Sequence, residues 1–225
     1  MKNVYIVLSA TPTLMGKIIR IFTRSLYNHS SISLTEDWSE MYSFARYRRL
    51  NPLVGGFVKE FPERLSLGKE RNVFIKVFKI PVNDCQYEEI KKFIYEIRDA
   101  EEENIYNTAA VLTILFKIKI NINNAYTCAD FVAESLFRGD IISRNQVSRD
   151  ILPDEIQKML DKHIYFHGCL NNYEPVKEII FDSKDFFEKT KIVKEIPRTY
   201  YHFKSLVKKI GSSSTSNITG ITKNQ

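Results

Sequence analysis

Apolar and polar positions follow two different periods in the first part of the chain. Residues 3–9 form a continuous apolar run of β-formers, which predicts a buried strand. Residues 15–27 place apolar side chains three and four positions apart, which predicts an amphipathic helix. The segments 29–34 and 39–44 flank the turn residues 35–37, so they predict a hairpin whose first strand is half-buried.

The stretch 46–68 lacks a clear period. It contains Pro52, the pair Gly55 and Gly56, and aromatic residues such as Phe57 that would be exposed in a loop. We therefore predict a long loop here. Long loops in compact domains often close over a functional site, so this segment is a candidate lid.

The rest of the chain mixes helical and strand patterns. Apolar residues with a helical period predict helices, β-rich runs predict strands, and a run of small polar residues predicts a disordered tail. The expected elements are a strand at 72–80, helices at 84–103, 107–116, 128–139 and 153–160, short strands at 164–166 and 178–181, and a tail at 211–225.

The charge of the chain is unevenly distributed. The 225 residues carry a net charge of +6, with basic side chains toward both ends of the chain and an acidic middle. The sequence has no zinc-finger spacing, ribonucleoprotein motif or basic zipper, so we expect a solvated lysine-rich surface and no nucleic-acid partner. Peripheral contact with a membrane through the lysine-rich region 184–209 stays open, as does the oligomeric state.

Neither export nor a membrane span is expected from the apolar runs. Residues 4–8 and 109–116 are too short for a signal-peptide core or a transmembrane helix. The three cysteines, Cys85, Cys128 and Cys169, are too few for a disulfide framework. We therefore expect a cytoplasmic protein in a reducing compartment.

Cys128 is the strongest candidate for chemistry. It occupies the first turn of a predicted helix, after Thr127 at the N-cap and with Asp130 placed for a variant capping box. The positive end of a helix favours the thiolate, which is the nucleophilic form of cysteine. The alternative is a small apolar residue buried in a helix, which is common for free cysteine.

A nucleophilic cysteine needs a base, usually histidine. His29 begins a predicted strand, and the hairpin brings Glu40 alongside, where a carboxylate can orient an imidazole. A structural histidine and a surface glutamate are the alternatives. The spacing of His163, His167 and Cys169 suggests a metal site, but no second cluster completes it, so we expect neither a metal nor another cofactor.

Four segments carry a resemblance to a known superfamily. NHSSISL (28–34), EMYSFAR (40–46), GGFVKE (55–60) and YTCADFVAESL (126–136) resemble the circularly permuted branch of the NlpC-type papain-like cysteine peptidases. That branch includes YiiX-like proteins and relatives of lecithin–retinol acyltransferase, and in it the histidine strand precedes the cysteine helix, as here. The resemblance covers about residues 1–145.

The resemblance implies a fold and an activity. The fold would be α+β, with a central antiparallel sheet packed against helices, in a permuted papain-like domain at 1–160 followed by an extension at 161–210. Cys128 would be the nucleophile, His29 the base and Glu40 the third polar residue. The reaction would be hydrolysis of an amide bond through a thioester. The residues expected to contact substrate are Tyr126, Arg46, Gly55, Gly56 and Phe57.

The substrate is open at this point. A γ-glutamyl or cell-wall-derived peptide is one expectation. A lipid acyltransferase or esterase with the same fold is an alternative, because the aromatic and basic stretch 46–61 suits an acyl chain with an anionic head group. A further alternative is a non-catalytic binding module that retains the fold.

Overall fold

The computed structural model is an α+β protein built on one large sheet, as the sequence predicts. It describes residues 1–68, 72–100, 105–107, 125–147, 151–177, 180–182, 184–188 and 192–219. Within these residues the sheet has eight strands in the order β7-β6-β4-β3-β2-β1-β5-β8. Neighbouring strands pair antiparallel, except that β6 and β7 pair in parallel. The strands are β1 (Lys2–Ser9), β2 (His29–Ser33), β3 (Met41–Arg48), β4 (Asn51–Lys59), β5 (Phe74–Val82), β6 (Ile105–Tyr106), β7 (Ala125–Tyr126) and β8 (Ile164–Cys169).

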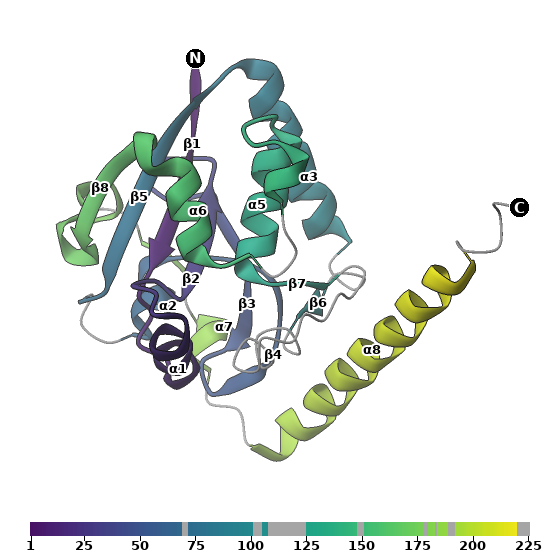
Figure 1. The fold of residues 1–225 in the computed structure, drawn as a ribbon. Helices are drawn as coiled ribbons and strands as arrows, with labels where there is room; N and C mark the ends of the chain where they lie inside the picture. Colours follow the sequence, from purple (N-terminus) through teal and green to yellow (C-terminus); the bar gives the residue numbers. More distant parts are fainter. Residues whose placement is uncertain are drawn as a thin grey trace, which may run out of the picture.

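Helices cover the sheet unequally. Figure 1 shows α3, α5 and α6 together on one face, whereas α8 lies beside β4 and its last turns extend beyond the body. The α-helices are α1 (Leu14–Thr23), α2 (Pro62–Ser66), α3 (Asp84–Asp99), α5 (Cys128–Arg138), α6 (Pro153–Leu160), α7 (Lys184–Phe187) and α8 (Ile192–Thr219). No helix in the described ranges is long and apolar enough to cross a membrane.

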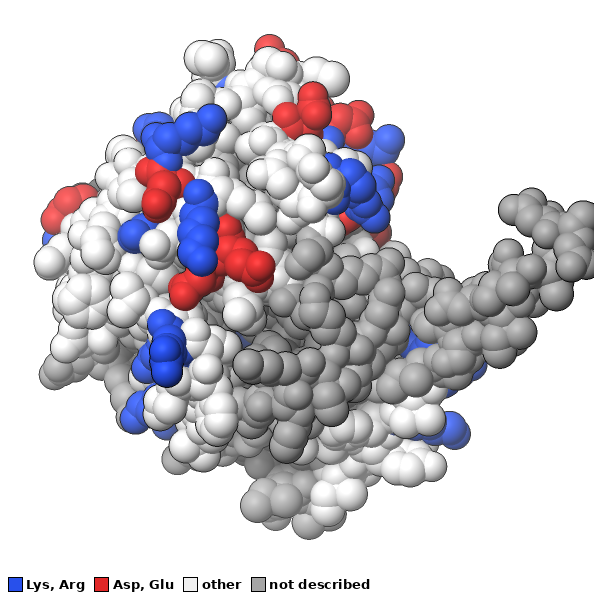
Figure 2. Space-filling model, in the orientation of Figure 1, with Lys and Arg blue, Asp and Glu red and all other residues white. Residues whose placement is uncertain are grey.

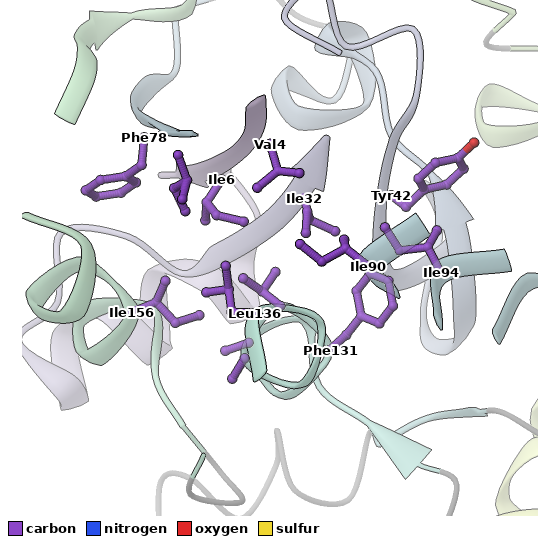
Figure 3. Packing of buried hydrophobic residues seen from close by; sticks show 14 of the residues in the cluster. Val4, Ile6, Ile32, Tyr42, Phe78, Ile90, Ile94, Phe131, Leu136 and Ile156 are labelled. Carbon is purple, nitrogen blue, oxygen red and sulfur yellow. The ribbon is translucent and has the colours of Figure 1, made fainter. Parts of the chain in front are cut away.

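The larger core lies between the sheet and the helices α3, α5 and α6. Ile6 and Ile32 of the central strands meet Ile94 of α3 and Phe131 of α5 there (Figure 3). Each of these four side chains is fully buried. This packing fixes α5 against β2 and β3, and so fixes where the first turn of α5 lies.

A second, smaller core covers the opposite face. Alternate residues of β1 enter the two cores, with Val4 and Ile6 on the helix side and Tyr5 and Val7 on the other. A strand buried on both faces has a continuous apolar sequence rather than an alternating one. The buried strand predicted at 3–9 is therefore confirmed.

The long loop predicted at 46–68 is wrong. Residues 51–59 form β4, paired with β3, and α2 follows. A Cβ on Gly55 would lie 2.3 Å from the backbone oxygen of Ala45. The glycine therefore allows close approach of the two strands rather than marking a loop. Phe57, expected to be exposed, is buried in the larger core.

The C-terminal part of the chain also differs from expectation. β8, from the expected extension 161–210, pairs with β5, so the sheet continues across the boundary at 160. α8 runs to Thr219, so most of the expected tail 211–225 is helical. The helix predicted at 107–116 lies outside the described residues except for Asn107. The strand predicted at 178–181 is described only at its last two residues, which have no regular structure.

Candidate active site

Cys128 begins α5, as predicted. The Thr127 hydroxyl accepts a hydrogen bond from the Asp130 backbone N–H at 3.1 Å, and the Asp130 carboxylate accepts one from the Thr127 N–H at 2.9 Å. This reciprocal capping box starts the helix, with Thr127 at the N-cap and Cys128 as the first helical residue. The thiol is therefore buried at the positive end of the helix.

His29 lies beside this thiol. It is the first residue of β2, the strand that packs against α5, and its imidazole lies close enough to the Cys128 thiol for each group to shift the pKa of the other. Nε2 of His29 lies 2.8 Å from Oε1 of Glu60, with the hydroxyls of Ser43 and Ser31 at 3.3 Å and 3.4 Å. Because Nε2 faces these oxygens, Nδ1 is the ring nitrogen available to the thiol.

The carboxylate that orients His29 is Glu60, not the expected Glu40. Glu60 directly follows β4, is 1% exposed, and accepts a hydrogen bond from Ser43 at 2.8 Å. Glu40 lies beside Leu34, whose N–H donates to the Glu40 carbonyl, and by its parity with Tyr42 it belongs to the sheet face that packs against α3, whereas Glu60 shares the opposite face with Ser43. The Glu40 carboxylate instead accepts from Tyr95 Oη at 3.0 Å.

The sequence pattern does not point to Glu60, because Pro52 and the pair Gly55–Gly56 favour a loop over a strand in the segment before it. A signal is nonetheless present, since the segment GGFVKE ends on this glutamate. Once 51–59 is a strand paired with β3, the residue after it falls beside Met41, and the Glu60 N–H donates to the Met41 carbonyl at 2.8 Å. The register of the hairpin thus places the Glu60 carboxylate within hydrogen-bond distance of Ser43 and His29.

Arg64 completes a chain of four ionisable groups, in which Cys128, Glu60 and Arg64 are buried and the His29 side chain is 12% exposed. Its Nε lies 3.1 Å from Oε2 of Glu60, and its guanidinium stacks over the ring of Phe186 with 4.3 Å between the charge centre and the ring centroid. It also donates to the Arg46 carbonyl. Cys128, His29, Glu60 and Arg64 therefore form a continuous series.

The neighbouring charges outweigh burial at each of the central groups. Burial alone would raise the pKa of Glu60, but the charge of Arg64 and the hydrogen bond from His29 lower that pKa to about 2. Burial would lower the pKa of His29, but a negative charge on Cys128 and hydrogen bonds with Cys128 and Glu60 raise it. Burial would raise the pKa of Cys128, but the positive charge of His29, its hydrogen bond and the Ser30 N–H lower it.

These shifts both favour the ionised pair, a thiolate beside an imidazolium, over the neutral pair. The charges then alternate along the series, with Cys128 negative, His29 positive, Glu60 negative and Arg64 positive. Each charge has an opposite neighbour, which is the condition under which charges tolerate burial. The arrangement can supply a nucleophile and, next to it, an acid.

A cavity of about 390 Å³ adjoins His29 and Glu60. Its largely apolar lining comes mainly from residues 11–19, from β3, β4 and the turn between them, and from residues 64–67, with Phe186 of α7. Three arginines, Arg46, Arg49 and Arg64, supply basic groups in the same lining. The space therefore suits a ligand that combines an apolar part with a negative charge.

The five residues expected to contact substrate fall in different places. Arg46 lines the cavity. Tyr126 packs on Phe44, with 5.1 Å between ring centroids, and Gly55 and Gly56 lie within the β3–β4 pairing. Phe57 belongs to the core and not to the cavity, because its parity on β4 points it toward α5, where its ring meets Phe131.

His167 and Cys169 of β8 lie apart from this site. His167 pairs with Lys76 across the sheet, and the Cys169 thiol lies 3.6 Å from the side-chain oxygen of Asn72. Among the residues that the structure describes, no group of three or more His, Cys, Asp or Glu side chains is placed to hold a metal ion.

Comparison with known proteins adds no relative. No family model matches the chain, and no curated protein resembles it closely enough to be reported as similar.

Proposed function

We propose that this protein is a cysteine hydrolase of permuted papain-like fold that cleaves an acyl bond through a thioester. The observation that carries the proposal is the buried contact of Cys128 with His29, which Glu60 holds from the other side. A nucleophile, a base and an orienting carboxylate in this order make up the generalised catalytic triad. The order along the chain, with the histidine strand before the cysteine helix, agrees with the permuted branch.

In the proposed reaction the Cys128 thiolate attacks the carbonyl carbon of the substrate. Backbone N–H groups at the start of α5 stabilise the negative charge that develops on the carbonyl oxygen. The His29 imidazolium gives its proton to the departing amine or alcohol, which leaves Cys128 acylated. His29 then removes a proton from water, whose oxygen attacks the thioester, and the carboxylic acid is released with the thiolate restored.

An amide bond is the simplest target. Arg46 and Arg49 in the cavity lining are complementary to a carboxylate, as in a γ-glutamyl or cell-wall-derived peptide. A second candidate is an acyl ester with an anionic head group, and it is favoured by the apolar lining, to which Leu14, Leu50 and Leu53 contribute. The same attack by Cys128 serves both.

A substrate panel tests the proposal. Wild-type protein is incubated with γ-glutamyl peptides, peptidoglycan fragments and phospholipids, and released amines, alcohols or fatty acids are measured by mass spectrometry. Cys128→Ala is the inactive variant, and Cys169→Ala, a thiol far from His29 in the fold, is the matched control. Turnover that survives in Cys128→Ala excludes the mechanism. A ligand that binds both proteins equally and is never turned over supports a binding module instead.

A further inference from the structure

The outer side of α1 is apolar and exposed. Ile19 faces the protein and is buried, whereas Leu14, Ile21, Phe22 and Leu26 are between 65% and 77% exposed. Scattered exposed apolar residues are ordinary, but four large ones on one helix and the residues after it are not. We name Leu14, Ile21, Phe22 and Leu26 the α1 surface.

The α1 surface continues into the cavity beside His29. Leu14 and Leu50 both line the cavity and are also largely exposed, at 77% and 67%. Leu50 lies in the turn between β3 and β4, so α1 and this turn form two sides of the entrance. An apolar surface therefore borders the opening that leads to His29.

The charged residues on α1 itself and beside Leu50 are basic. Lys17 and Arg24 are exposed on and just after α1, Arg49 is exposed beside Leu50, and α1 itself contains no acidic residue. Asp154, on α6, approaches the end of the helix but accepts a hydrogen bond from the Ser25 hydroxyl at 2.6 Å. In Figure 2 the lower left, over α1, shows basic side chains among uncharged ones.

We propose that the α1 surface docks on an anionic lipid bilayer and so brings the cavity entrance to the membrane. A helix with large apolar side chains on its exposed side and basic groups beside them is the pattern of an interfacial helix, since the apolar side chains enter the acyl boundary and the cations meet the head groups. A second copy of the chain fits less well, because a two-fold contact through this surface would bring Lys17 and Arg24 near their own symmetry mates. The exposed leucines and phenylalanine also distinguish it from a nucleic-acid surface.

This inference does not depend on the proposed chemistry. Docking uses α1 and the β3–β4 turn, and it is measured with Cys128→Ala, which cannot hydrolyse lipid during the experiment. Vesicle binding without any hydrolysis would leave docking standing and remove the proposed function. Hydrolysis of soluble amides without vesicle binding would remove docking and leave the proposed function standing.

The test is co-sedimentation of full-length Cys128→Ala with two vesicle types. One type is pure phosphatidylcholine, and the other contains about 30% phosphatidylserine. We expect binding to the anionic vesicles that weakens with rising salt. Adding Lys17→Gln and Arg24→Gln should weaken it about 30-fold, since each basic residue near the membrane contributes roughly a factor of five. Phe22→Ser with Leu26→Ser should reduce it at least tenfold.

Two sets of control variants define what overturns the proposal. Lys92→Gln with Ile164→Ser removes an exposed charge from α3 and an exposed apolar side chain from β8, and should bind as the parent does. Lys204→Gln with Val207→Ser tests α8 as a competing surface. Docking through α1 is overturned if anionic vesicles are not bound, or if the α1 variants bind unchanged. It is also overturned if gel filtration shows a dimer that only the α1 variants dissociate.

Discussion

Two glutamates, Glu40 and Glu60, lie on either side of Met41 but on opposite faces of the sheet, and their carboxylates have opposite environments. On one face Glu60 is buried between His29 and Arg64 and has a pKa of about 2. On the other face Glu40 accepts a hydrogen bond from Tyr95 of α3. Burial with charged partners on both sides makes a carboxylate able to hold an imidazolium, whereas nearness in the sequence does not.

The largest effect should come from removing the proposed nucleophile, Cys128, on the Glu60 side. Cys128→Ala should reduce turnover of any substrate that the wild type cleaves by at least about 10³-fold, because the residual rate comes only from binding and oxyanion stabilisation. The measurement is kcat/KM on the substrate found in the panel. Cys85→Ala should stay near the wild-type value, since Cys85 is exposed at the start of α3. A similar loss in both variants would mean that the effect is not chemical.

Exchanging the two carboxylates for amides compares the two faces of the sheet directly. Glu60→Gln should lower kcat/KM by about 10²-fold or more, because a neutral amide does not stabilise the His29 imidazolium. It should also lower the free energy of unfolding by about 3–5 kcal/mol, because Arg64 is left buried without its partner. Glu40→Gln should change kcat/KM less than twofold. Urea unfolding and steady-state kinetics measure the two effects.

A double variant separates stability from chemistry. Glu60→Gln with Arg64→Met removes both buried charges, so it should recover much of the lost unfolding free energy. Its kcat/KM should stay as low as that of Glu60→Gln, because His29 still lacks a carboxylate. Recovery of activity together with stability would show that Glu60 has only a structural role.

Alkylation should reveal the lowered pKa of Cys128. A thiol with a lowered pKa stays ionised as the pH falls, so Cys128 should react with iodoacetamide at pH 6 at least about tenfold faster than Cys85 or Cys169. The sign reverses when the cation is removed: in His29→Ala burial raises the pKa, and reactivity should appear only at alkaline pH. Peptide mass spectrometry of the labelled sites gives the three rates. Equal rates at Cys128 and Cys169 would contradict the thiolate–imidazolium pair.

The sequence predicts one side of this site better than the other. Cys128 and His29 are predictable because local signals place them, the capping box at Thr127 in one case and the start of an apolar strand in the other. Glu60 depends on a hairpin register that local pattern does not specify. The Gly55–Gly56 pair is typical of a loop, and only the approach of the neighbouring β3 backbone shows that it belongs inside a strand.

The cavity and the α1 surface likewise depend on tertiary packing that the local sequence pattern does not specify. The period of apolar residues predicts the helix at 15–27. It does not specify which part of a wide apolar stripe stays exposed to solvent. That depends on what packs beside α1. Segments distant in sequence, such as Phe186 of α7 and Leu50, meet at the cavity only through tertiary packing.

The smallest expected effect tests the hydrogen bond between Tyr95 and Glu40. Tyr95→Phe removes the hydroxyl that donates to Glu40, and because both groups are only partly buried, the free energy of unfolding should fall by about 0.5–1.5 kcal/mol. The alkylation rate of Cys128 should not change, since the Tyr95–Glu40 hydrogen bond and the Glu60–His29 contact lie on opposite faces of the sheet. Urea unfolding and labelling of the same sample give both numbers. A change in the Cys128 rate would mean that the two faces are coupled through the sheet, and the contrast between Glu60 and Glu40 would then be one of degree.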